Sequence, residues 1–168
     1  VFMYYRGPDS LDDQEATFAA DVFGNLIIDP KSKFTENICK NPIFKIPNSN
    51  YFASWYTTKL ASGIINFVAM FSEPENNLPQ RVKTFYDTIQ NIEIPKIIND
   101  KKYFSKKEFK VIKQKLLDNK LLSQETPEEF LNSLRYYWAS TNVDYFYSYE
   151  ENLLKVDHNQ IANYLTNY

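Results

Sequence analysis

The side chains most often used for catalysis are scarce in this chain of 168 residues, which has one histidine, His158, and one cysteine, Cys39. A catalytic zinc needs three protein ligands drawn from His, Cys, Asp and Glu, usually including paired imidazoles, and His158 has no imidazole partner. A serine or cysteine nucleophile needs a nearby base, which is most often histidine. The segment around Cys39 (NICKN) matches no nucleophile signature, and a free cysteine is commonly a small buried hydrophobe. The sequence therefore predicts no catalytic residue and no metal ligands, with Cys39 as a structural thiol.

The charge balance argues against a nucleic-acid partner. The chain has 19 Lys and Arg against 21 Asp and Glu, a formal net charge of -2 and a pI near 5.5, whereas nucleic-acid binders usually carry a basic face. One local cluster of lysines is the exception, and most of it falls on a predicted helix beside Glu108 and Asp118, which favours a solvated helix face over a phosphate-binding patch. The cluster comprises Lys101, Lys102, Lys106, Lys107, Lys110, Lys113 and Lys115.

A single cysteine excludes an internal disulfide, and no apolar run approaches the roughly 18 residues that span a bilayer. Val1 begins inside a strand-like segment rather than a secretory leader, so we expect residues 1–168 to be one domain cut from a longer, multi-domain chain. The compartment stays open between a bacterial periplasm and a cytoplasm. The 13 Tyr and 13 Phe suit either a core or a peptide- or glycan-binding surface, and their periodic spacing favours the core.

The first half of the chain predicts a strand, two helices and a hairpin. Residues 1–6 form a β-branched and aromatic run that ends at Gly-Pro-Asp, which indicates a strand and a turn. A helix capped by Ser10 should then run to about Ile28. Asp29 as a cap with Pro30 at the first helical position predicts a short second helix that ends near Cys39.

Residues 41–50 indicate a loop, because they contain two prolines and three asparagines. The next two stretches, 51–59 and 63–72, have the alternation of strands, and the short break at 60–62 predicts an antiparallel hairpin. Tyr51, Ala53, Trp55 and Thr57 share one face of the first strand, and Ile65, Phe67, Ala69 and Phe71 share one face of the second.

After residue 74 the chain indicates helices, each beginning with a cap residue and a Glu or Gln three positions later. These pairs are Asn77 with Gln80, Ser105 with Glu108, Thr126 with Glu129 and Asp157 with Gln160, and Pro127 strengthens the third. Another helix is expected over residues 145–155. The predicted buried stripes are Val82, Phe85 and Ile89; Phe109, Ile112 and Leu116; and Phe130, Leu134 and Trp138. This order predicts an α+β fold in which helices pack on one face of an antiparallel sheet.

These segments together resemble a non-catalytic half-domain of the pitrilysin and insulinase family of zinc peptidases. The resemblance rests on ordered matches over nearly the whole chain: Tyr5 to Asp9 (YRGPD), Asp29 to Ser32 (DPKS), Ser72 to Pro74 (SEP), Arg81 to Phe85 (RVKTF), Thr126 to Phe130 (TPEEF), Tyr136 to Trp138 (YYW), Asp144 to Phe146 (DYF) and Val156 to Leu165 (VDHNQIANYL). It implies a metallohydrolase half-domain fold of the LuxS/MPP type.

In that family two similar halves face one another across a chamber, and one half carries an inverted His-x-x-Glu-His zinc motif. The first helix of this chain, where the motif would lie, has the sequence DQEATF over residues 13–18, without histidine. Glu15 is therefore expected to be an acidic residue of a first helical turn, because a base without metal-bound water has nothing to activate. The family often holds substrate with an Arg and a Tyr seven residues apart, which this chain lacks. Lys40 and Tyr51 are the nearest chemically plausible substitutes for this pair. The alternative is that Lys40 is only a charged loop residue and that Tyr51 only packs in a strand.

The resemblance implies a chamber wall that needs no cofactor of its own, with zinc in a sister catalytic domain of the same chain. It also implies a peptide substrate and the possibility of a homodimer. Two alternatives stay open: a wholly non-enzymatic scaffold, and an aromatic-rich module that binds peptide or glycan. His158, at the start of the last predicted helix, is expected to lie exposed at the surface without a functional role.

Overall fold

The computed structural model describes residues 1–71 and 77–168. Its sheet has three strands, β1 (Phe2–Arg6), β2 (Phe52–Thr57) and β3 (Ile64–Ala69), in the order β1-β3-β2 with both pairs antiparallel. The predicted hairpin is thus confirmed, and β1 joins it on the far side of β3. The predicted turn at residues 72–74 lies outside the described residues.

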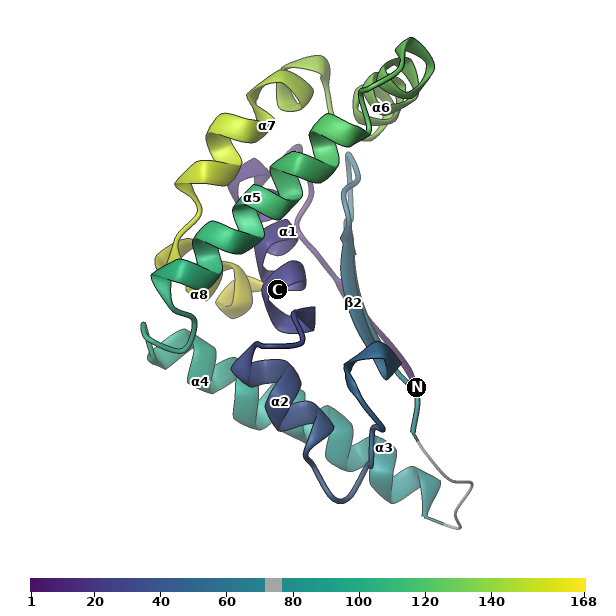
Figure 1. The fold of residues 1–168 in the computed structure, drawn as a ribbon, viewed down its shortest axis with the longest axis vertical. Helices are drawn as coiled ribbons and strands as arrows, with labels where there is room; N and C mark the ends of the chain where they lie inside the picture. The colour runs from purple at the N-terminus through teal and green to yellow at the C-terminus, as the bar shows by residue number, and fades with distance from the viewer. Residues whose placement is uncertain (72–76) are drawn as a thin grey trace.

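The helices that the sequence predicts follow one another in the expected order. The helices and helical turns of the structure are α1 (Gln14–Ile28), α2 (Lys33–Cys39), the 3-10 turn η1 (Ser49–Tyr51), α3 (Leu78–Asp87), the π-helical turn η2 (Thr88–Glu93), α4 (Ile94–Asn99), α5 (Lys106–Leu122), α6 (Pro127–Ser140), α7 (Val143–Lys155) and α8 (His158–Asn167). Of these, η1, η2 and α4 are additional to the predicted helices. Figure 1 shows the helical layer on one side of the sheet, with α6 at one end of β2. No helix within the described ranges is both long and apolar enough to cross a bilayer.

The core lies between the sheet and α1. Helix α1 packs against β2 on one side and against α5, α7 and α8 on the other, and ten of its fifteen residues are buried. The sheet contributes Phe52, Ile65, Phe67 and Ala69 to the same core. Because side chains alternate along a strand, the neighbouring residues of each strand face away from the helices.

Three of the four predicted capping boxes are present. Ser105, Thr126 and Asp157 each accept a hydrogen bond from the backbone of the Glu or Gln three positions later, whose side chain binds back to the cap. Asn77 makes no side-chain cap, so that part of the prediction is wrong. Pro79 in the first turn of α3 already fixes the backbone there and has no N–H to satisfy.

Two predicted helix starts lie too early in the chain. Asp13, rather than Ser10, caps α1 and accepts from the Ala16 N–H at 3.1 Å. The Asp9 carboxylate accepts from the Asp12 N–H at 2.9 Å, so residues 9–12 form a separate turn. Similarly Ser32, rather than Asp29, caps α2, because residues 29–32 close a turn through a hydrogen bond from the Ser32 N–H to the Asp29 carbonyl.

The helical segment from α3 to α4 contains the π-helical turn, which the sequence analysis did not predict. Pro95 is the second residue after this turn and cannot donate a hydrogen bond to the carbonyl four residues earlier. Glu93 at the end of the turn is buried, and it accepts hydrogen bonds from Lys96 at 2.8 Å, from Asn37 at 3.1 Å and from the hydroxyl of Tyr103. The turn therefore places a buried carboxylate where α2, α4 and the loop before α5 meet.

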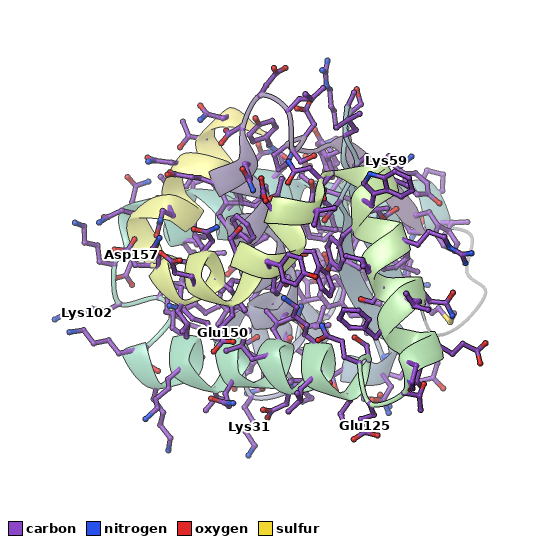
Figure 2. The ribbon with its side chains drawn as sticks, turned by 90° about the horizontal axis from the view of Figure 1, so that it is seen from above. Lys31, Lys59, Lys102, Glu125, Glu150 and Asp157 are labelled. Carbon is purple, nitrogen blue, oxygen red and sulfur yellow. The ribbon has the colours of Figure 1, made fainter. Side chains whose placement is uncertain are left out.

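The prediction of a buried stripe on α6 is wrong. None of its residues is buried, and Trp138 is 69% exposed. Helix α6 packs mainly against α7, its nearest neighbour in the chain, so only part of its apolar surface has a partner. Figure 2 shows charged side chains such as Lys31, Lys102 and Glu125 projecting from the periphery of the molecule.

Candidate functional site

The start of α1, where the resemblance would place metal ligands, is closed by packing. Glu15 is exposed in the first helical turn, while Ala16, Thr17 and Phe18 are buried. The Thr17 hydroxyl lies 2.9 Å from the hydroxyl of Tyr145 on α7, and the Phe18 ring stacks on the ring of Tyr145 at 4.7 Å. Within residues 1–71 and 77–168, no three His, Cys, Asp or Glu side chains gather as a metal site would require.

Neither His158 nor Cys39 lies in a setting typical of a catalytic residue. His158 is half-buried rather than exposed, so the prediction for its location is wrong. Its Nε2 donates to the Ile97 carbonyl at 2.7 Å, which ties α8 to α4. Cys39 ends α2, and burial raises the pKa of its thiol. A raised pKa lowers the thiolate fraction, which is the opposite of what a nucleophile needs.

A buried polar cluster lies between α1 and α7. Asp21 in the middle of α1 accepts a hydrogen bond from the hydroxyl of Tyr149 at 2.9 Å. Burial raises the pKa of Asp21 to about 7, against the opposing effect of that hydrogen bond. Burial and the nearby Asp21 charge also raise the pKa values of Tyr137, Tyr145 and Tyr149. The tyrosine hydroxyls stay protonated near neutral pH, so the group that titrates in this cluster is Asp21.

The face of the sheet that points away from the helices carries a row of exposed apolar side chains, which we call the open face. Tyr4 on β1 and Trp55 on β2 both pair with Asn66 on the central strand and therefore flank it on the same side. Tyr4 is 64% exposed and Trp55 45% exposed. The open face consists of Phe2, Tyr4, Tyr51, Trp55 and Met70.

The two predicted substrate-holding residues lie on different surfaces. Tyr51 belongs to the open face, because its carbonyl accepts from the Met70 N–H at 2.9 Å and continues the pairing of β2 with β3. Lys40 follows the last residue of α2, where it forms an ion pair with Glu36 and lines a shallow hollow of about 370 Å³ together with Ser49. The structure therefore groups Tyr51 with other aromatic residues and leaves Lys40 apart from them.

Most of the open face was not predicted from the sequence. The sequence signal for the open face is the alternation along the two strands of the hairpin. This alternation groups Tyr51 with Trp55 but does not show which side of the sheet the helices cover. Phe2 and Tyr4 lie in the first strand, whose position beside β3 depends on a contact with residues more than 60 positions away. The rings of Phe2 and Tyr4 are nearly parallel, with their centroids 6.4 Å apart.

Solved structures share the fold of this chain. No protein-family model and no curated protein matches the chain. Among solved structures, the inactive peptidase domain of a candidate zinc protease from Bordetella parapertussis matches with a TM-score of 0.76 and 15% identity, over 99% of this chain and 84% of that one. The chain has the fold of that peptidase domain. The α+β prediction and the resemblance drawn from the sequence are thereby confirmed at the level of the fold.

Two further structures agree. A candidate zinc protease from Bordetella pertussis matches with a TM-score of 0.70 and 14% identity, over 99% of this chain and 85% of that one. The periplasmic protease PqqL from Escherichia coli matches with a TM-score of 0.63 and 10% identity, and this chain corresponds to 17% of its length. The same fold thus occurs as part of a longer chain.

Proposed function

We propose that this chain is the non-catalytic domain of a zinc peptidase and that its open face forms part of the wall of the substrate chamber. A sister domain that carries His-x-x-Glu-His and the zinc would hydrolyse the peptide. The observation that carries the proposal is the open face, an exposed aromatic surface on a domain with the fold of an inactive peptidase domain. The start of α1 supports it, because Thr17 and Phe18, in the segment where the family's metal ligands would lie, are packed against Tyr145.

The open face suits an extended peptide. Contiguous exposed apolar surface on a soluble domain usually marks a binding site, and aromatic side chains contribute large contact areas at a small cost in conformational entropy. Phe2 and Tyr4 lie along β1, and Trp55 lies across the sheet from them, so the rings flank a shallow strip above Val68 and Asn66. A peptide that lies over this strip would contact rings on both sides without needing a particular sequence.

The two tryptophans of the chain make the peptide-binding part testable. Trp138→Phe leaves Trp55 as the sole tryptophan, so its fluorescence reports on the open face alone. The probe is reduced, carboxymethylated ribonuclease A, an unfolded polypeptide that contains no tryptophan. We expect a saturable blue shift of Trp55 emission, and a weaker response when Tyr4→Ala is added. The matched control is Trp55→Phe, which leaves only Trp138 on α6 and should not respond. If Trp55 shows no response, the open face is not a peptide-binding surface.

The non-catalytic part needs a separate measurement. The purified chain should contain no stoichiometric zinc and should leave the same unfolded polypeptide uncleaved, while addition of a sister domain with His-x-x-Glu-His should produce cleavage. One tight zinc per chain would refute this part of the proposal. Peptide binding without any catalytic sister would instead favour the alternative of a wholly non-enzymatic, aromatic-rich binding domain.

A further inference from the structure

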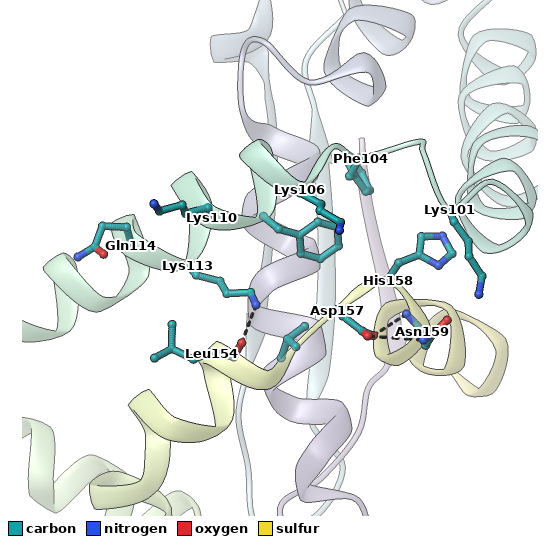
Figure 3. Close-up of a pocket in the computed structure, with 12 residues that line it drawn as sticks. Lys101, Phe104, Lys106, Lys110, Lys113, Gln114, Leu154, Asp157, His158 and Asn159 are labelled. Atoms are coloured by element: carbon teal, nitrogen blue, oxygen red, sulfur yellow. Dashed lines mark hydrogen bonds between the residues drawn. The ribbon is translucent and has the colours of Figure 1, made fainter.

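A second candidate site lies in the helical layer, on the opposite side of the sheet from the open face. A cavity of about 530 Å³ opens between the first half of α5 and the junction of α7 with α8 (Figure 3). That volume is within the range of pockets that enclose small ligands, about 300–1,000 Å³. We propose that this cavity binds a small amphipathic anion, with one acidic head group on an acyl or aryl body.

The floor of the cavity is apolar. Phe104 and Val156 are both buried at its base, and Phe109 and Leu154 form its walls. The rings of Phe104 and Phe109 meet edge to face, with centroids 6.4 Å apart. A fully hydrated inorganic anion would gain little from these groups, because the benefit of such a floor comes from removing apolar ligand surface from water. The floor therefore selects a ligand with an apolar body.

The rim of the cavity is cationic. Lys106, Lys110 and Lys113 are spaced four and three residues apart and so share one side of α5, and Lys101 lies on the loop that precedes it. Lys101, Lys106 and Lys110 take part in no ion pair with any residue that the structure describes. Like charges in this arrangement repel one another, and an anionic head group would relieve that repulsion. Lysine ammonium groups act as point charges and suit a simple carboxylate or phosphate head.

One acidic group in the lining offsets part of the positive charge of this rim. The carboxylate in the lining is Asp157, which caps α8 by accepting from the N–H groups of Asn159 and Gln160 at 2.7 and 3.2 Å. Lys113 is fixed by its hydrogen bond to the Leu154 carbonyl at 2.8 Å, which joins α5 to α7, and burial lowers the pKa of its ammonium group (Figure 3). The rim thus combines a fixed lysine with three lysines that are available to a ligand.

The lining also contains a polar atom without a partner. With its Nε2 bonded to the Ile97 carbonyl, His158 presents an Nδ1 that is buried and makes no hydrogen bond to any described residue. A buried polar atom in that state costs free energy until something binds to it. His158 lines the cavity, and because its Nε2 donates, its Nδ1 is an acceptor that a hydroxyl or N–H group of the ligand could satisfy. Phe104 and Val156, at the base of the cavity, are buried rather than protruding, which favours a small ligand over a bilayer surface.

The test measures the binding of octanoate to the intact chain by isothermal titration calorimetry. Octanoate should bind saturably with one molecule per chain, octanol should bind more weakly because it lacks the charge, and acetate should not bind because it lacks the apolar body. The variant Lys106→Gln/Lys110→Gln should weaken octanoate binding by about three- to tenfold, as expected for two exposed charge contacts. The matched control, Lys107→Gln/Lys115→Gln, removes two charges from the same helix outside the cavity and should bind as the native chain does.

Leu154→Ser tests the apolar part separately, since Leu154 is half exposed and its loss should not impair folding, which circular dichroism would check. Octanoate affinity should fall in this variant also. The proposal is overturned if octanoate does not saturate, if both lysine pairs have the same effect, or if acetate competes with octanoate. Binding to phosphatidylglycerol vesicles without binding of free octanoate would also overturn it, because it would show a lipid surface as the partner.

Discussion

Replacing Asp21 with asparagine should remove most of the pH dependence of the protein's stability between about pH 5 and about pH 8. Asp21 is half-buried on α1 and has an uncharged partner, the hydroxyl of Tyr149 at 2.9 Å. Burial disfavours the charged carboxylate and raises the pKa of Asp21 from 3.8 to about 7. Asparagine has nearly the same shape and keeps an oxygen that accepts from Tyr149.

The sign and size follow from proton linkage. The folded protein binds the Asp21 proton more tightly than the unfolded chain does, so the stabilisation is complete below the unfolded pKa of 3.8 and is lost as pH rises through about 7. At about 1.4 kcal/mol per unit, the full loss is at most ~4 kcal/mol, and the part between pH 5 and pH 8 is ~2–3 kcal/mol. Water that still reaches the carboxyl reduces both figures.

Urea denaturation monitored by circular dichroism at several pH values in this window measures the effect directly. The free energy of unfolding of the native chain should fall with rising pH, while that of Asp21→Asn should stay nearly constant and exceed it at about pH 8. Asp118→Asn is the control, because Asp118 is exposed on α5. Parallel profiles for the native chain and Asp21→Asn would refute the assignment of a raised pKa to Asp21.

Further predictions concern the buried carboxylate and two glycines. Burial by itself would raise the pKa of Glu93, but its hydrogen bonds outweigh this effect and lower the pKa. Glu93→Gln should therefore reduce the free energy of unfolding by about 1–3 kcal/mol near neutral pH. This difference should disappear as acid protonates the native carboxylate. Urea midpoints at about pH 7 and about pH 3 would show this, and an equal loss at both would contradict it. Gly63→Ala should be strongly destabilising, since its Cβ would lie 2.1 Å from the Pro8 carbonyl oxygen. Gly24→Ala has 3.9 Å to its nearest neighbour and should raise the thermal midpoint through a gain of about 0.5–1 kcal/mol; the reverse order would refute the packing argument.

Local sequence signals predicted the elements whose ends depend on nearby residues. The boxes at Ser105, Thr126 and Asp157 are examples, because cap and partner lie within one turn. The starts of α1 and α2 could not be predicted in the same way, since several residues in each segment can cap a helix and the preceding turn decides between them. The π-helical turn before Pro95 depends on the burial of Glu93 against α2, a contact across 56 positions in the sequence.

The sites were harder to predict than the fold, because each combines residues from distant parts of the chain. The lysines of α5 looked like a solvated helix face, and a sequence cannot show that α7 and α8 bring Leu154 and Val156 beneath them. The aromatic residues were difficult to assign for a different reason, because some that belong to strands are exposed. Most of these rings are buried or pack against the core, as predicted. Strand alternation alone could not separate Phe52, which is buried, from Trp55, which is exposed.

Because of the packing at the start of α1, changing one or two residues should not create a metal site there. Thr17 and Phe18 are fully enclosed, and their contacts with Tyr145 join α1 to α7. An imidazole in place of Thr17 would displace the Tyr145 hydroxyl from a buried hydrogen bond, and it would still lack the open coordination position that catalysis needs. The absence of histidine from α1 and the packed tyrosine cluster are thus two aspects of one arrangement, in which the start of α1 holds the helical layer together.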